Sequence, residues 1–475
     1  MLLTITDWLW SYVLIAALLI VGTRYTVGSK GVQIRLFRRA LSVLSHIEWR
    51  SSEKGISSFQ ALAVSVAGRV GGGNIAGVAV AITLGGPGAL FWMWLIALLG
   101  MATSLFECAL AQLYKRRHGR EVKRRHGREV FRGGPAYVMR YGLGWRTLPV
   151  IYSVLLLVTI GFGFNAVQSY VVTASIESAF DIPPMISGIV MTAVMAFILF
   201  GGMRRLALVS EIIVPLMVVG YLLLTLVVLS LNFADIPDAL HLIFASAFGL
   251  EQAVGGGIAA AIAQGARRGL FSNEAGLGTV PNVAAAADVP HPISQGLVQS
   301  LSVFIDTIIL CTATALMILM SSVYGAPGQE VPGVALTQMA VAEHLGPFGE
   351  TMVSVALVLF ATTTIAYNSF LGENSIAYFE RLGPRAVFFF RVSVLAMIAW
   401  ASVQDLGTVF GFADLTMALL ALTNLLALWA LYPVGMALLE HFEQQLHLGD
   451  APAFSRDLLP EADLDPESWP QTAQK

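Results

Sequence analysis

Two long apolar stretches of the chain are interrupted near their middles by runs of glycine and polar residues. The first interruption is Gly71-Gly72-Gly73-Asn74, and the second runs from Phe271 to Gly276. Glycine lets a helix unwind without steric cost, but backbone groups freed at membrane depth must be satisfied by protein or by a water-filled cavity. Paired interrupted helices are typical of the binding site of a secondary transporter.

The composition indicates a polytopic membrane protein. Of the 475 residues, 56% are hydrophobic and only 12% are charged, so lipid solvates this chain better than water. Because about 20 apolar residues span the hydrocarbon core, we expect an all-α membrane protein of about eleven transmembrane helices. They lie near residues 8–27, 57–83, 88–114, 147–176, 185–201, 206–231, 250–286, 293–322, 350–372, 386–403 and 408–438. The first apolar segment lacks a basic n-region and a clear cleavage site, which favours a retained helix.

The distribution of lysine and arginine predicts the orientation of these helices. Alternate connections are basic, as in Arg24 to Lys54 and Lys115 to Arg132, whereas the connections between them, such as Phe180 to Pro184, carry no Lys or Arg. Basic loops stay in the cytoplasm. We therefore expect a multi-pass protein of the cytoplasmic (inner) membrane, embedded in the lipid bilayer, with its N-terminus outside and its C-terminus in the cytoplasm.

The two glycine breaks suggest an internal repeat. When the first helix is set aside, each break falls in the first helix of a consecutive set of five. An odd number of helices per half makes the halves cross in opposite senses, which is a 5+5 inverted repeat. The expected organisation is an extra N-terminal helix (1–30), a basic linker (31–56), two five-helix repeats (57–231 and 240–440) and an acidic, disordered cytoplasmic tail (441–475).

A short tandem duplication lengthens one cytoplasmic loop. Residues Lys115 to Val122 recur unchanged as Lys123 to Val130. Cytoplasmic loops of membrane proteins usually carry an excess of Lys and Arg, which explains the basic residues of this loop without a nucleic-acid partner.

The first break offers partners to an anion and to a cation. Free N–H groups of Gly72, Gly73 and Asn74 suit a substrate carboxylate, while carbonyls near Val70 and Gly71 suit a dehydrated sodium ion. The alternative is that small residues only allow close helix packing. Three glycines followed by Asn exceed what packing needs, so we favour binding.

The second break adds acceptors for an ammonium group. Ser272, Asn273 and Glu274 carry side-chain oxygens, and Phe271 is placed to wall an apolar pocket. A zwitterion would find complementary groups in the two breaks. Alternatively, the Glu274 carboxylate stabilises the N-terminus of the restarted helix, a role compatible with the site.

Arg69 lies about a dozen residues into its span, where an unpaired charge costs about 2.5 kcal/mol or more. Its candidate partners are Glu274, Glu107 and Asp306. Three roles remain open for Arg69: it contacts the substrate, it acts as a gate, or it ties two helices together. The tie is favoured.

Hydroxyl and amide groups of later spans complete the predicted site. Thr363 and Thr364 in the ninth span supply oxygen to sodium, together with Asn74, unless they bond only to their own helix. Gln168 of the fourth span either reaches the same cavity or links two helices.

Signatures of an enzyme are missing from the sequence. No phosphate-binding loop and no nucleophile motif is present, and the histidines lack metal-ligand spacing. Cys108 and Cys311 lie in apolar stretches far apart, so no disulfide framework is indicated. We expect no enzymatic activity and no cofactor; sodium, the coupling ion, is the only metal.

At these motifs the chain resembles the alanine or glycine:cation symporter family, also called sodium:alanine symporters. The resemblance runs from about residue 55 to 440 and rests on Gly55–Leu62, Gly68–Val78, Gly85–Gly88, Phe131–Tyr137, Phe304–Thr307 and, most specifically, Arg268–Gly276. It implies a LeuT-type fold and uptake of a small neutral amino acid, alanine or glycine, with sodium. It also implies that the first break, residues 271–273 and the Thr363-Thr364 helix line one site.

Two departures from the family pattern bear on the substrate. Gly72 stands where the family commonly has Thr, and Tyr367-Asn368 stands where Gly-Trp is expected. Asn368 therefore brings a polar group to the substrate pocket in place of an aromatic wall, and a larger or more polar amino acid is an alternative substrate. The rival functions are proton-coupled transport through Glu274 or Asp306, an amino-acid-sensing membrane protein that does not transport, and a channel.

Overall fold

The computed structural model describes residues 2–45, 56–118, 130–201, 203–249, 257–324, 333–379 and 382–469. Most of the duplicated segment (119–129), part of the basic linker (46–55) and the side chains of Arg204-Arg205 lie outside the described part. The described chain is almost entirely helical, and its one sheet is a two-stranded hairpin of β1 (Arg116–His118) and β2 (Val130–Arg132). The prediction of an all-α membrane protein is confirmed.

The helices follow one another along the whole chain, several of them continued by π-helical turns. Their bounds are α1 Leu2–Trp8, α2 Ile15–Gly28, α3 Val32–Arg35, α4 Phe37–Ser45, α5 Ser58–Arg69, α6 Val78–Gly85, α7 Ala89–Leu113, α9 Pro135–Tyr137, α10 Leu148–Val158, α11 Asn165–Phe180, α12 Pro184–Phe200, α13 Met203–Leu231, α14 Ile236–Ala247, α15 Ile258–Asn273, α16 Pro281–Ala284, α17 Pro292–Val303, α18 Thr312–Leu319, α19 Gly333–Tyr378, α20 Pro384–Ala401, α21 Leu406–Ala430 and α22 Tyr432–His447.

Eight described helices are long and apolar enough to cross a membrane, and a ninth span results when the bent pair α5 and α6 is counted as one. The 17-residue α12 adds one shorter apolar helix, and the 16-residue α15 leads into the second break. The structure is thus consistent with eleven spans. Long α19 contains a kink at Gly346, where φ is +65° and Pro347 follows, so only its second part corresponds to the expected ninth span.

Local sequence explains where several helices begin. Ser57 and Gln60 form a capping box at the start of α5, since each side chain bonds the other residue's backbone N–H. Helices α10, α12, α17 and α20 carry proline in their first turn, where the missing N–H costs nothing.

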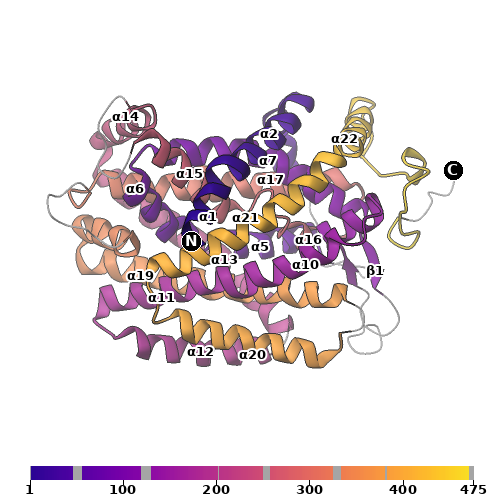
Figure 1. The fold of residues 1–475 in the computed structure, drawn as a ribbon. Helices are drawn as coiled ribbons and strands as arrows, with labels where there is room; N and C mark the ends of the chain where they lie inside the picture. Colours follow the sequence, from indigo (N-terminus) through magenta and orange to yellow (C-terminus); the bar gives the residue numbers. More distant parts are fainter. Residues whose placement is uncertain are drawn as a thin grey trace.

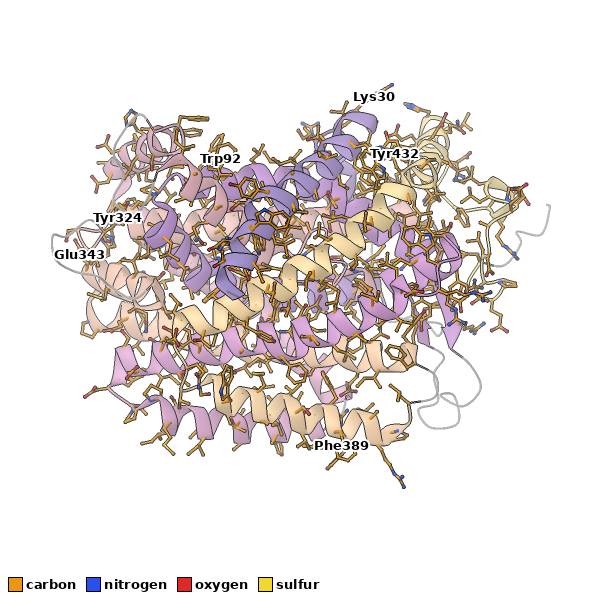
Figure 2. All side chains as sticks on the ribbon, viewed as in Figure 1. Lys30, Trp92, Tyr324, Glu343, Phe389 and Tyr432 are labelled. Carbon is orange, nitrogen blue, oxygen red and sulfur yellow. The ribbon has the colours of Figure 1, made fainter. Side chains whose placement is uncertain are left out.

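Two groups of helices surround the glycine breaks. Helix α7 packs against α15 and α17, and α11 packs against α19. Figure 1 shows α10, α11, α12, α20 and α21 running alongside one another, with α14 at one end of the molecule and the β1–β2 hairpin at the opposite end, here called the hairpin end. Large apolar side chains face outward on the flank, as Phe389 of α20 does at 67% exposure (Figure 2), which suits a lipid-facing surface.

The C-terminal segment differs from the disordered tail that its composition suggested. After α22 the chain folds back over the hairpin end as far as Trp469, whose indole N–H donates to the Leu113 carbonyl at 3.1 Å. The Trp469 ring packs 5.0 Å from that of Phe454, and Asp463 pairs with Arg116 at 2.7 Å. A few apolar side chains and two complementary arginines, Arg116 and Arg117, therefore dock a segment that is mostly acidic.

Replacing Trp469 by alanine should destabilise the protein because it removes a buried ring and the hydrogen bond to Leu113. We expect a loss of about 3 kcal/mol and a Tm lower by about 2–4 °C, measured by thermal unfolding in detergent. Glu461→Ala, in an exposed part of the same segment, is the matched control and should leave the Tm unchanged. Equal Tm values for both variants would show that the segment is not docked.

Candidate functional site

The first break is present where glycine predicted it. Helix α5 ends at Arg69, Val70 is extended, and the chain resumes as a π-helical turn (Gly73–Gly77) that leads into α6, bent by 49° from α5. The Gly71 N–H donates to Asn74 Oδ1 at 3.0 Å, and the Gly72 N–H donates to Gln168 Oε1 at 3.0 Å. Both N–H groups thus face side-chain oxygens, in the place where a carboxylate would accept.

Three other helices approach the glycine run so closely that a side chain at any of these positions would have to displace a neighbour. A Cβ atom built on Gly71 would lie 2.5 Å from Thr364 Oγ1, and one on Gly72 would lie 2.8 Å from Gln168 Oε1. On Gly73 it would lie 3.2 Å from the Phe271 ring. The glycines therefore serve close packing as well as unwinding, and α11, α15 and α19 converge on the break.

The second break is longer than the sequence suggested. Helix α15 ends at Asn273, and Glu274 follows in the left-handed region with φ +55°. Gly276 and Gly278 also have positive φ, and helix returns only at α16. Glu274 is therefore the C-cap of α15, and the alternative role considered for it, at the N-terminus of a restarted helix, is not observed.

Asp306 joins the two breaks. Its carboxylate accepts from Asn74 Nδ2 at 2.7 Å and from Ser272 Oγ at 2.7 Å, one residue from each break. Thr307 Oγ1 donates to it at 2.9 Å. The side chain is buried, and no basic side chain of the described residues lies within 4.0 Å of it. Because a buried carboxylate is costly without a compensating charge, this position suits a cation or a proton.

Thr364 is the threonine that reaches the first break. Its hydroxyl lies within hydrogen-bond distance of two carbonyl oxygens, Ala67 on α5 (3.2 Å) and Phe360 on its own helix (2.9 Å). The hydroxyl of Thr363 bonds only to carbonyls one turn earlier in α19. Of the two predicted sodium ligands, the structure places Thr364 opposite the glycine run and Thr363 against its own helix.

Arg69 is held by neutral groups instead of a carboxylate. Its guanidinium donates to the Gln299 carbonyl at 3.0 Å, to Ser302 Oγ, and to Ser104 Oγ at 2.9 Å. Among the described residues no acidic oxygen lies within 4.0 Å of it, so the expected direct pairing with Glu274, Glu107 or Asp306 is not observed. Arg69 instead ties α5 to α7 and α17.

The other two acidic side chains hold the second break in shape. Glu274 accepts from Thr279 Oγ1 at 2.6 Å and from the Tyr367 hydroxyl at 3.3 Å. Glu107 accepts from the Gly276 N–H at 3.3 Å and from Asn424 Nδ2 at 2.9 Å. Both carboxylates therefore stabilise the non-helical backbone between α15 and α16.

Asn368 lies beside the first break without touching it. Its amide donates to Asn165 Oδ1 at 2.9 Å, and its own Oδ1 has no partner among the described residues. Asn368 is one helical turn beyond Thr364, and Asn165 is one turn before Gln168. The pair forms a polar layer next to the site on the hairpin side.

An ion pair that was not predicted from the sequence lies on the side of the site opposite the Asn368–Asn165 pair. Arg268 of α15 pairs with Asp414 of α21 at 2.5 Å, and both side chains are buried. Phe271 lies one helical turn further along α15. Its ring centroid is 4.6 Å from that of Phe164 and 5.8 Å from that of Phe410. A single acid within the apolar run of α21 was a usable signal, since charges at this depth are rare unless paired.

Comparisons with known proteins agree on one family. A family model described as the sodium:alanine symporter family matches residues 1–456. A Bacillus subtilis protein named probable sodium/glutamine symporter GlnT is 40% identical over 453 residues, which cover 95% of this chain and 92% of that protein. A second B. subtilis protein, named putative sodium/proton-dependent alanine carrier protein YrbD, is 38% identical over 464 residues, covering 95% and 94%.

A solved structure shows the same fold. The crystal structure of MhsT in complex with L-phenylalanine matches with a TM-score of 0.56 at 14% identity, over 87% of this chain and 93% of that chain. This similarity confirms the LeuT-type fold.

Asp414→Asn should destabilise the protein by about 3–5 kcal/mol because it leaves Arg268 buried without its charged partner. The double variant Arg268→Met with Asp414→Leu should recover most of this loss, as measured by thermal unfolding. Asp7→Asn is the control, since Asp7 pairs with Arg267 at the surface (2.7 Å, Asp7 side chain 63% exposed) and should cost about 0–1 kcal/mol. A double variant as unstable as Asp414→Asn would contradict a specific buried pair.

Proposed function

Because the chain belongs to the sodium:alanine symporter family, we propose that it carries out sodium-coupled symport of a small neutral amino acid, alanine or glycine, across the cytoplasmic membrane. Its relatives carry names of sodium-coupled amino-acid carriers. The observation that carries the proposal is the meeting of both helix breaks at one buried carboxylate, Asp306. Paired broken helices with complementary polar groups suit a zwitterion and a cation together.

The amino acid would lie between the two breaks. Its carboxylate takes the N–H groups of Gly71 and Gly72, displacing the oxygens of Asn74 and Gln168 that they now face. Its ammonium group lies toward the oxygens of Ser272, Asn273 and Asp306. The ring of Phe271 limits the space left for a side chain, which favours a small substrate.

Sodium would lie at the open end of α5. The carbonyls of Val70 and Gly71 and the hydroxyl of Thr364 supply oxygen ligands, which a hard cation prefers. Asn74 contacts both binding regions, because its Oδ1 accepts from Gly71 and its Nδ2 donates to Asp306. A substrate carboxylate that displaces Asn74 from Gly71 frees an oxygen for the ion, so each ligand should strengthen binding of the other.

Transport requires the site to open to each side in turn. On the side of α14, which we assign to the cell exterior, Arg268 and Asp414 close the route. On the hairpin side, which we assign to the cytoplasm, the Asp288 N–H donates to the Ile56 carbonyl at 3.0 Å and joins the start of α5 to the chain after α16. Rocking of the α5–α7–α15–α17 group against the α10–α12 and α19–α20 group would break one closure at a time.

Proton coupling is the second candidate function. Asp306 accepts three hydrogen bonds and, within the described chain, pairs with no basic side chain. A carboxylate in such a place can bind a proton instead of sodium.

Uptake of radiolabelled alanine into proteoliposomes tests the proposal. An inward sodium gradient should drive accumulation above equilibrium at constant pH, and glycine should compete more strongly than larger amino acids. Asp306→Asn should abolish this accumulation while the protein still inserts and unfolds cooperatively. Accumulation that needs a pH gradient and no sodium would support proton coupling, and binding without accumulation would support a sensor.

Thr364→Val should raise the sodium concentration for half-maximal uptake by about tenfold, the equivalent of about 1.4 kcal/mol for one lost ligand. Maximal uptake at saturating sodium should change little. Thr362→Val is the matched control, because the Thr362 hydroxyl bonds only to the Val358 carbonyl of its own helix. The same sodium requirement in both variants would show that Thr364 is not an ion ligand.

A further inference from the structure

Tyr367 of α19 contacts both helix breaks from the hairpin side. The side chain is buried, and its hydroxyl donates to Glu274 Oε2 at 3.3 Å, at the C-cap of α15. Its ring packs against Gly68, which precedes the first break in α5, and a Cβ atom built on Gly68 would lie 2.2 Å from that ring. A single side chain of α19 therefore joins the two broken segments next to the site.

The helix fixes the position of this ring relative to the proposed ion site. Tyr367 follows Thr364 by three residues, so the two side chains lie on the same face of α19. Thr364 reaches the Ala67 carbonyl of α5 at 3.2 Å, and Tyr367 packs on the neighbouring Gly68. The ring therefore fills the space between α5 and α19 on the hairpin side of the sodium position. An ion that leaves the site between these helices in that direction must displace the ring.

Two further hydrogen bonds cross between the same groups of helices on this side of the site. The Tyr152 hydroxyl of α10 donates to the Gly278 carbonyl at 2.8 Å, and Asn374 Nδ2 of α19 donates to Asn282 Oδ1 at 3.3 Å. Like the Tyr367 bond, each joins α10 or α19 to the chain between α15 and α17. These elements belong to opposite groups in the rocking motion proposed above. All three bonds must therefore break when the groups separate on the hairpin side.

We propose that Tyr367 is the gate between the site and the cytoplasm, an inference that rests on the proposed transport function and orientation. While the ring lies on Gly68 and the hydroxyl holds Glu274, the route is closed. Movement of α19 away from α5 and α15 breaks both contacts together and opens it. Because a hydrogen bond to a charged acceptor shifts a two-state equilibrium by about tenfold or more, loss of the hydroxyl favours the state that is open to the cytoplasm.

A native cysteine reports access to the site. Cys311 Sγ lies 3.5 Å from Asn74 Nδ2 and 3.4 Å from Ser272 Oγ. A membrane-impermeant methanethiosulfonate reagent added to inside-out or right-side-out membrane vesicles reaches the protein from one face only. Mass spectrometry of the digested protein separates labelling of Cys311 from labelling of Cys108. Labelling needs no transport, so failure of the gate and failure of alanine uptake are separate results.

Tyr367→Phe keeps the ring and removes the hydrogen bond to Glu274. In inside-out vesicles, the reagent should label Cys311 about tenfold faster in this variant than in the wild-type protein, with no increase in right-side-out vesicles. Tyr221→Phe is the matched control and should be labelled at the wild-type rate. It also removes one buried tyrosine hydroxyl, which lies 2.7 Å from Thr314 Oγ1 between α13 and α18.

Three outcomes would overturn the proposal. They are an unchanged labelling rate for Tyr367→Phe in inside-out vesicles, an equal increase in Tyr221→Phe, and an equal increase from both faces of the membrane, which would indicate general loosening. Thermal unfolding checks that each variant folds. If Tyr367→Phe does not fold, Gly68→Ala decides the test by the same criteria, because its methyl group displaces the same ring and leaves the hydroxyl in place.

Discussion

The hydrogen bonds of the Asp306 carboxylate hold together the two places where the membrane helices are broken. Asn74 donates from the π-helical turn of the first break, and Ser272 donates from the last turn of α15, just before the second break. Breaks at this depth survive only if protein groups satisfy the freed backbone. Gln168 and Glu107 do this by accepting from the N–H groups of Gly72 and Gly276, whereas Asp306 bonds to side chains of both breaks. An ion or an amino acid bound at either break therefore changes the surroundings of the other.

The same logic explains the arrangement of charge around the site. Arg69 is satisfied by hydroxyl and carbonyl groups, which leaves the nearby carboxylates free of a fixed positive partner. The buried ion pair between Arg268 and Asp414 lies to one side of the breaks, and within the described chain Arg268 makes no ion pair with Asp306. The Asp306 carboxylate thus lies between the two breaks with no basic side chain of the described residues within 4.0 Å of it.

The first break could be predicted from the sequence because three glycines followed by Asn exceed what helix packing needs. For Gln168, Thr363 and Thr364 the sequence left bonds within or between helices open, and the structure places Gln168 and Thr364 at the break. The partners of Arg69 and Asp414 could not, because they lie on other helices, between 35 and 233 residues away along the chain, and depend on how the helices pack. Glu274 was placed in the right break but given the wrong local role, since the sequence does not show that helix resumes only at Pro281. The docked C-terminal segment was missed because three buried apolar residues (Phe454, Leu464 and Trp469) hardly alter an acidic composition.

The central claim is that ion and amino acid occupy one connected site. The most direct measurement is the affinity of the purified protein for alanine at several sodium concentrations, together with its affinity for sodium at several alanine concentrations. We expect sodium to lower the Kd for alanine and alanine to lower the Kd for sodium by the same factor, because the coupling free energy is reciprocal. Affinities that do not depend on the other ligand would contradict a shared site at the two breaks.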